Sequence, residues 1–184
     1  VYATQAAADA DCFYQVNDRD QREYFGAGDV RFVDKDKNGV IDENDRFVIG
    51  DPNPDVYGNI YTRVNWKNWA LNATMRYSLG NDVYNYQRSL LESGSRFHNQ
   101  TTAMLEHWTA ENQQTDIPRI SYGDPMGNSR FSDRWIEDGS YIRLSNVTLS
   151  YTIPIISTYL QGITLWGGAY NLFTLTHYLG SDPD

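Results

Sequence analysis

The stretch VYGNIYTRVNWKNWALNATMRYSL, residues 56–79, decides the fold because its apolar side chains recur at every second position. Its first half places Ile60 and Val64 on one face and Arg63 on the other. After the pair at 67–68, the second half alternates in the same way. Since side chains alternate between the two faces of a strand, the pattern predicts two strands joined by a two-residue turn.

Two further strands are expected at 141–152 and 162–172, the second with the weakest alternation. Ile142 and Leu144 are out of phase with the apolar set that begins at Val147. That phase change indicates a bulge or a stretch above a membrane. A short connection containing Pro154 joins this last pair of strands.

The connections differ in length, and all the long ones fall on one side of the predicted sheet. Outer-membrane barrels combine short periplasmic turns with long extracellular loops, and roughly 10 residues of strand suffice to cross the bilayer. The fold class is therefore predicted as all-β, a partial transmembrane β-barrel of about four antiparallel strands, with long extracellular loops that contain a short helix. Aromatic residues that would form interfacial girdles are Tyr57, Trp66, Trp69, Tyr77, Tyr141 and Tyr151.

Composition narrows the classes of function. The 184 residues include 15 Lys and Arg against 24 Asp and Glu, a formal charge of −9, which argues against nucleic acid as a partner. No apolar run approaches the roughly 18 residues that would predict a membrane-spanning helix. The single Cys12 cannot form an internal disulfide.

The chain divides into four regions by pattern. Residues 1–56 are irregular and acidic, with a short helix expected around 3–10, and are predicted to be an extracellular loop region. Residues 57–79 form the barrel hairpin, 80–140 a long extracellular loop, and 141–184 a strand pair with the start of the next loop. Within the long loop a short helix is expected at 101–110, capped by Asn99 or Thr101.

The sharpest local motif is DKDKNGVIDEND, residues 34–45, which fits a calcium loop of the EF-hand type except that an aspartate replaces the closing glutamate. The spacing predicts side-chain, carbonyl or water-mediated oxygen ligands for a structural Ca²⁺. An ordinary turn rich in aspartate and asparagine is the alternative. The predicted ligands are Asp34, Asp36, Asn38, Val40, Asp42 and Asp45.

Several stretches in a fixed order resemble the C-terminal part of a SusC/RagA-family TonB-dependent outer-membrane transporter. They are GDVRFVD (28–34) leading into NGVID (38–42), IGDPNP (49–54), GNDVYN (80–85), SDRWIEDGSYIRL (132–144) and NLFTLT (171–176). The resemblance covers nearly the whole chain from about residue 26 onward.

The resemblance implies a 22-stranded barrel with an N-terminal plug in the outer membrane of a Gram-negative bacterium. It also implies import of glycan or peptide substrate with a SusD-like surface lipoprotein as lid, driven through TonB, with outer-membrane lipid around the barrel. The plug, the TonB box and the final strand are expected to lie outside this sequence. The alternative is a soluble, calcium-stabilised cell-surface β-domain that binds carbohydrate.

No catalytic role is expected. The carboxylates of the long loop have no catalytic spacing, and His98, His107 and His177 match neither a zinc motif nor a triad. Residues 132–140 are expected to anchor the loop to the barrel rim. Aromatic residues of the loop, which could stack on sugar rings, pack against a partner or form the loop's own core, are Tyr84, Tyr86, Phe97, Trp108 and Tyr122, with the core role favoured for Trp108.

Overall fold

The computed structural model describes residues 1–155, 159 and 162–183. The chain forms two compact units, each built from two separate stretches. Unit 1 comprises Val1–Ile49 and Asn85–Trp135, and unit 2 comprises Gly50–Tyr84 and Ile136–Asp184. The short connection predicted to contain Pro154 lies mostly outside the described residues, and Pro154 itself is the last residue of the strand before it.

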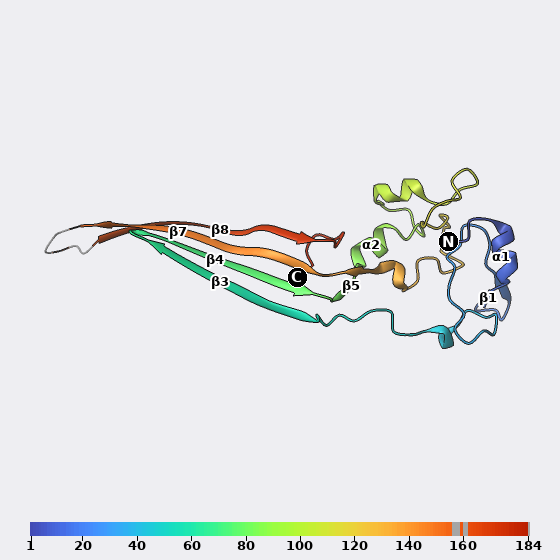
Figure 1. The fold of residues 1–184 in the computed structure, drawn as a ribbon. Coiled ribbons are helices and arrows are strands. Elements are labelled where there is room, and N and C mark those ends of the chain that lie inside the picture. Colours follow the sequence, from blue (N-terminus) through green and yellow to red (C-terminus); the bar gives the residue numbers. More distant parts are fainter. Residues whose placement is uncertain (156–158, 160–161, 184) are drawn as a thin grey trace. The chain divides into compact units, whose positions relative to one another are not determined.

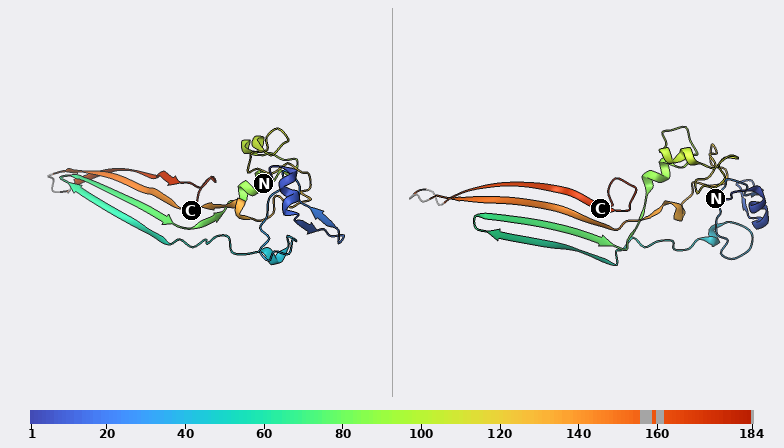
Figure 2. Two further views of the ribbon diagram at one scale, coloured as in Figure 1. Left: turned by 45° about the vertical axis from the view of Figure 1, so that its right-hand side comes forward. Right: turned by 45° about the horizontal axis from the view of Figure 1, so that its top comes forward.

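Unit 2 contains the four predicted strands as one antiparallel sheet in the order β3-β4-β7-β8. The strands are β3 (Val56–Trp66), β4 (Trp69–Leu79), β7 (Tyr141–Pro154) and β8 (Gly162–Thr176). They form a single layer, as Figure 1 and the two views of Figure 2 show. The sequence prediction is confirmed for the first three strands, and the fourth continues four residues past its predicted end at 172.

The hairpin between β3 and β4 closes with the expected two-residue turn. Trp66 pairs directly with Trp69, and Lys67 takes a left-handed φ of 53° in the turn between them. A second, two-stranded sheet of unit 2 joins β5 (Asp82–Tyr84) to β6 (Ile136–Asp138). This small sheet was not predicted, because strands of three residues carry too little alternation to be recognised.

The register makes the apolar face continuous across the four-stranded sheet. One row runs from Ile60 through Met75 and Leu144 to Phe173. Ile60 keeps 48% of its surface exposed and Leu149 keeps 45%, so this face is not sealed inside a globule. The opposite face is polar, as the row Arg63, Asn72, Thr148, Gly168 illustrates.

A bulge in β7 explains the phase change found in the sequence. Leu144 pairs with Met75 and Asn146 pairs with Thr74, which leaves Ser145 as the extra residue. Because one additional residue reverses the alternation, Leu144 returns to the face that carries the other apolar side chains. The predicted bulge is confirmed.

The aromatic residues do not all form the expected girdle. At the turn end, Trp66 pairs with Trp69. The ring centroids of Trp69 and Tyr151 lie 4.6 Å apart, and all three rings lie on the apolar face. At the other end the register places Tyr57 opposite Ser78 and therefore on the polar face. Tyr141 lies on that face too, so the girdle prediction was wrong for Tyr57 and Tyr141, because strand alternation turns them away from the apolar side.

Unit 1 is built from short elements and turns. Its helices and strands are α1 (Gln5–Asp11), β1 (Tyr14–Val16), β2 (Arg22–Tyr24), α2 (Tyr86–Leu91) and the 3-10 helices η1 (Glu43–Asp45), η2 (Thr102–Glu106) and η3 (Asp133–Trp135). A small core gathers Tyr2, Ala8, Phe25, Ile41 and Met126 from both stretches of the unit. No helix in the described part of the chain has the length and apolar character to span a membrane.

The helix predicted at 101–110 is shorter than expected. Only η2 forms, and its N-cap residue Thr101 makes no side-chain capping bond. Beyond it, the backbone N–H of Trp108 donates to the carbonyl of Ile117 at 2.9 Å, and its indole N–H donates to the carbonyl of Ala3 at 3.0 Å. These tertiary bonds hold Trp108 in unit 1 and override its helical propensity.

Candidate metal and ligand site

The acidic loop at 34–45 is tightly wound by its own side chains. The carboxylate of Asp34 accepts backbone N–H bonds from Lys37 at 2.6 Å and from Gly39 at 2.8 Å. Asn38 continues the pattern by accepting from the N–H of Val40 at 2.6 Å. Lys37 and Gly39 take φ values of 61° and 80°, so the loop turns sharply at two left-handed positions.

The second half of the loop returns to the first through Asp45. Asp42 caps η1, and the Asp45 carboxylate, 8% exposed, accepts from the N–H groups of Lys35 at 2.8 Å and Asp42 at 2.9 Å. As a result, Asp34, Asp36 and Asp45 each bring a carboxylate oxygen within 4.8 Å of the others. Within residues 1–155, 159 and 162–183, this is the one group of three such side chains placed to hold a metal ion.

The three carboxylates of this cluster carry like charges, which repel one another. Desolvation raises the pKa of Asp36, and the neighbouring charges of Asp45 and Asp34 raise it further. For Asp34, desolvation acts in the same direction, but the backbone N–H bonds led by Gly39 outweigh it and hold the pKa below the ordinary value. Carboxylates kept this close favour a bound cation or a shared proton.

Three of the six predicted ligands therefore come together as carboxylates. Asp42 is not part of the cluster, and its Oδ1 accepts from the N–H of Asn44 at 2.7 Å. The side-chain amide N–H of Asn38 donates to the carboxylate of Asp36 at 2.9 Å. Val40 lies in the same loop and forms an isolated β-bridge with Tyr14.

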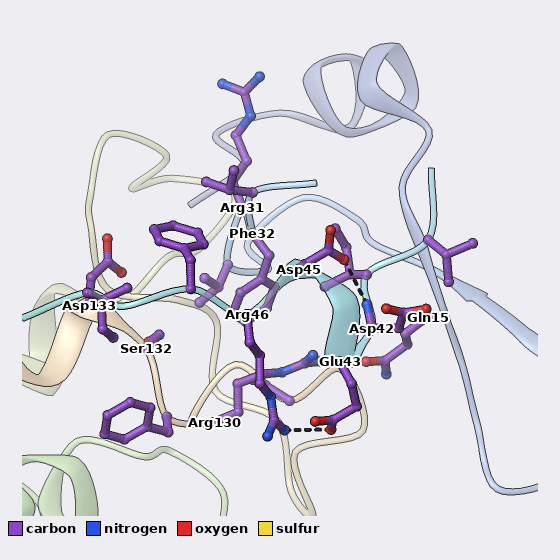
Figure 3. Close-up of a pocket in the computed structure, with 18 of the residues that line it drawn as sticks. Gln15, Arg31, Phe32, Asp42, Glu43, Asp45, Arg46, Arg130, Ser132 and Asp133 are labelled. Atoms are coloured by element: carbon purple, nitrogen blue, oxygen red, sulfur yellow. Dashed lines mark hydrogen bonds and ion pairs between the residues drawn. The ribbon is translucent and has the colours of Figure 1, made fainter. Parts of the chain in front are cut away.

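A cavity of about 1240 Å³ lies against this loop within unit 1. Its walls come from residues 15–16, 30–33, 40–49 and 124–133, and Figure 3 shows its charged side chains. Glu43 and Arg46 form an ion pair of 2.5 Å on one wall. The cavity joins segments that lie far apart in the sequence, and for that reason sequence patterns did not predict it.

Arg130 forms another wall of this cavity. Its guanidinium lies 4.4 Å from the ring centroid of Phe32 and donates to Gln15 at 2.5 Å and to the carbonyl of Met126 at 2.8 Å. Burial lowers the pKa of Arg130 from its ordinary value. The side chain therefore joins the β1 segment to the 124–133 segment and fixes the shape of the cavity.

A partly buried ion pair between Asp29 and Arg119 joins the two stretches of unit 1. Asp29 is fully buried and accepts from Arg119 at 2.8 and 2.9 Å, from the Asn128 amide at 2.9 Å and from the N–H of Gly26 at 2.9 Å. Asn128 in turn accepts from the N–H of Val30 at 2.8 Å. The carboxylate is thus hydrogen-bonded through both of its oxygens, as a buried charge requires.

The fold and the site now define a class of protein. Four long antiparallel strands with one apolar and one polar face, combined with long loops that form their own folded unit, are the features of an outer-membrane β-barrel. Comparisons with known proteins narrow this class further.

No family model matches the chain. TonB-dependent receptor P3 of Formosa agariphila is 37% identical over 160 residues, which are 85% of this chain and 15% of that receptor. The TonB-dependent receptor SusC of Bacteroides thetaiotaomicron is 28% identical over 157 residues, 83% of this chain and 15% of SusC. The solved structure of the RagAB peptide transporter is similar with a TM-score of 0.63 and 30% identity, over 71% of this chain and 14% of that chain.

The chain belongs to the SusC/RagA family of TonB-dependent receptors, as its motifs indicated. Its sheet is part of a barrel in the outer membrane of a Gram-negative bacterium. These relatives are receptors and transporters rather than enzymes. The chain spans about 15% of the curated relatives it matches, and its expected position near their C-terminus stays a prediction.

Proposed function

We propose that this chain supplies part of the wall and the outer loops of an importer that moves oligosaccharides or peptides across the outer membrane. The observation that carries the proposal is the division of the sheet into an apolar face and a polar face in a chain of this family. The apolar face suits contact with hydrocarbon. The polar face suits a wet lumen, where Arg63 and Arg76 keep their charges hydrated.

We also propose a SusD-like surface lipoprotein as the lid of the parent receptor and TonB as its source of energy. Support comes from the motifs that resemble the family and from the similarity to SusC and to the RagAB transporter. TonB would act through parts of the receptor outside this sequence. Loops of unit 1 are candidates for contact with the lid, since long outer loops are where such barrels meet their partners.

Deleting the gene of the parent receptor tests the importer role. We expect the deletion strain to lose growth on one class of oligosaccharides or peptides above porin size while it keeps normal growth on the matching monomers. A plasmid copy of the full-length gene should restore growth, and a copy without its TonB box should not. Unchanged growth of the deletion strain on every oligosaccharide and peptide source tested would refute an import function.

For the acidic loop we propose a structural Ca²⁺ held by Asp34, Asp36 and Asp45. Their oxygens fit a hard divalent cation, and one of them is already buried. A bound cation would neutralise the clustered charge. It would also fix the wall that Asp42, Glu43 and Asp45 give to the large cavity of unit 1.

Calcium titration of the chelator-treated full-length receptor by calorimetry checks this proposal. The double variant Asp34→Asn/Asp36→Asn is expected to weaken calcium binding by at least about tenfold, since it removes two of three clustered charges. On acidification, the affinity for calcium should fall at a higher pH than it does for a site of aspartates with ordinary pKa values. The reason is that the raised pKa of Asp36 lets this side chain take up a proton at higher pH. Asp116→Asn, on an exposed loop, is the matched control. Absence of heat from the unmodified receptor at millimolar calcium would defeat the proposal.

A further inference from the structure

Two aromatic rings of unit 1 stack on each other in solvent. Phe97 is 95% exposed and Tyr122 is 73% exposed, yet their ring centroids lie 5.1 Å apart with 26° between the ring planes. Leaving two large rings in water is unfavourable by the hydrophobic effect. Two neighbouring exposed rings give a ligand an apolar surface on which to pack.

The stack is held by the backbone beneath it. The N–H of Gly123 donates to the carbonyl of Ser95 at 2.9 Å, which ties the segment that carries Tyr122 to the segment that carries Phe97. A Cβ on Gly94 would lie 3.2 Å from the buried side chain of Met104, so this turn packs closely on the interior of unit 1. The two segments that carry the rings are therefore bonded to each other and packed on the interior of unit 1.

A cavity of about 290 Å³ opens beside the rings. Both rings line it together with Ile120, and its polar side chains are those of Ser95, Arg96, His98 and Gln100. Its volume lies at the lower end of small-molecule sites, which suits one ring of a ligand. The described residues that line it include no carboxylate.

The aromatic surface and the polar side chains of this cavity together fit one class of ligand. A pyranose ring has an apolar face of C–H groups that packs on an aromatic ring, and a rim of hydroxyl groups that needs hydrogen-bond donors and acceptors. Phe97 and Tyr122 supply the aromatic surface, while Arg96, His98 and Gln100 supply the polar groups. Neither segment that lines the cavity forms a strand, so the cavity offers no strand edge to which an extended peptide could add.

We infer that the Phe97–Tyr122 stack and its cavity form a sugar-binding subsite that holds one pyranose unit of an oligosaccharide. The inference deepens the proposed importer role, on which its biological purpose rests, by naming the substrate class as glycan. Arg96 would accommodate a uronic acid as well as a neutral sugar, because its guanidinium can pair with a carboxylate or with hydroxyl groups.

The test uses the purified full-length receptor without its lid, in a detergent that carries no sugar headgroup. Binding is measured to immobilised hexasaccharides of glucose, mannose, xylose and galactose and to oligogalacturonate, with aromatic- and proline-rich decapeptides as the peptide arm. We expect at least one oligosaccharide to bind, and Phe97→Ala or Tyr122→Ala to weaken that binding about tenfold. Tyr122→Phe, which keeps the ring, should stay within about twofold of the unmodified receptor.

Tyr24→Ala is the control, because it removes a partly exposed ring of the same unit that does not line the cavity. The inference is overturned if no oligosaccharide binds, if only the decapeptides bind, or if the two alanine variants bind oligosaccharide like the control. Binding by the purified receptor is independent of growth of the deletion strain. Failure of the subsite can therefore be told apart from failure of the importer.

Discussion

Arginine at Val147 is expected to prevent the full-length receptor from accumulating in the outer membrane, whereas arginine at the next residue, Thr148, is tolerated. Val147 lies mid-strand on the apolar face, between Ala73 and Ala169. An arginine facing hydrocarbon near the bilayer centre costs roughly 2–4 kcal/mol. Thr148 lies between Asn72 and Gly168 on the polar face, where water or polar groups can solvate the guanidinium.

The measurement is the amount of folded receptor in isolated outer membranes, read from its heat-modifiable migration on gels. Because the two positions are adjacent, they share backbone environment, expression context and distance from the turn. Equal loss for Val147→Arg and Thr148→Arg, or greater loss for Thr148→Arg, would contradict the assignment of the two faces.

Asp29→Ala is expected to open unit 1 to protease in the full-length receptor. The substitution leaves Arg119 and Asn128 without the carboxylate that they share, and a buried polar group left without its partner, as the Asn128 amide would be, costs about 1–3 kcal/mol. We expect rapid cleavage within residues 85–135 when whole cells are treated with trypsin, while the strands stay protected. Asp18→Ala, an exposed aspartate of the turn between β1 and β2, is the control and should leave the digestion pattern unchanged.

If Asp29→Ala were digested no faster than Asp18→Ala, the ion pair would not be what joins the two stretches of unit 1. A result of that kind would also contradict the role of the ion pair in holding the two walls of the unit 1 cavity together. The acidic loop and the cavity wall formed by residues 124–133 belong to the stretches that this ion pair connects.

The sheet was predictable because its signal is local and repeated. Strict alternation at 56–79 predicted both strands and their turn. The broken phase at Ile142 and Leu144 indicated a bulge or a stretch above a membrane, and the structure shows a bulge at Ser145. The C-terminal end of β8 was harder to place, since the polar face of this strand carries Trp166 and Tyr170 and the contrast between its two faces is weak.

The interior of unit 1 was not predictable by the same means. Asp29 and Arg119 are 90 residues apart, and no periodic pattern relates them. Local spacing predicted that Trp108 lies in a helix, but its hydrogen bonds to the carbonyl groups of Ala3 and Ile117 place it outside one. By contrast, the cluster of Asp34, Asp36 and Asp45 could be predicted, because a twelve-residue motif contains all three carboxylates and the backbone N–H groups that bind Asp34 and Asp45.

The importer role proposed for this chain requires that one face of the sheet meets hydrocarbon and the other meets water. Nitroxide labels placed one at a time at residues 146–150 of the full-length receptor in lipid bilayers, with Cys12 replaced by serine, test it most directly. We predict that labels at 147 and 149 collide preferentially with oxygen, which partitions into lipid, and that labels at 146, 148 and 150 do not. Collision rates without a period of two, or with the opposite phase, would show that the apolar face does not meet hydrocarbon.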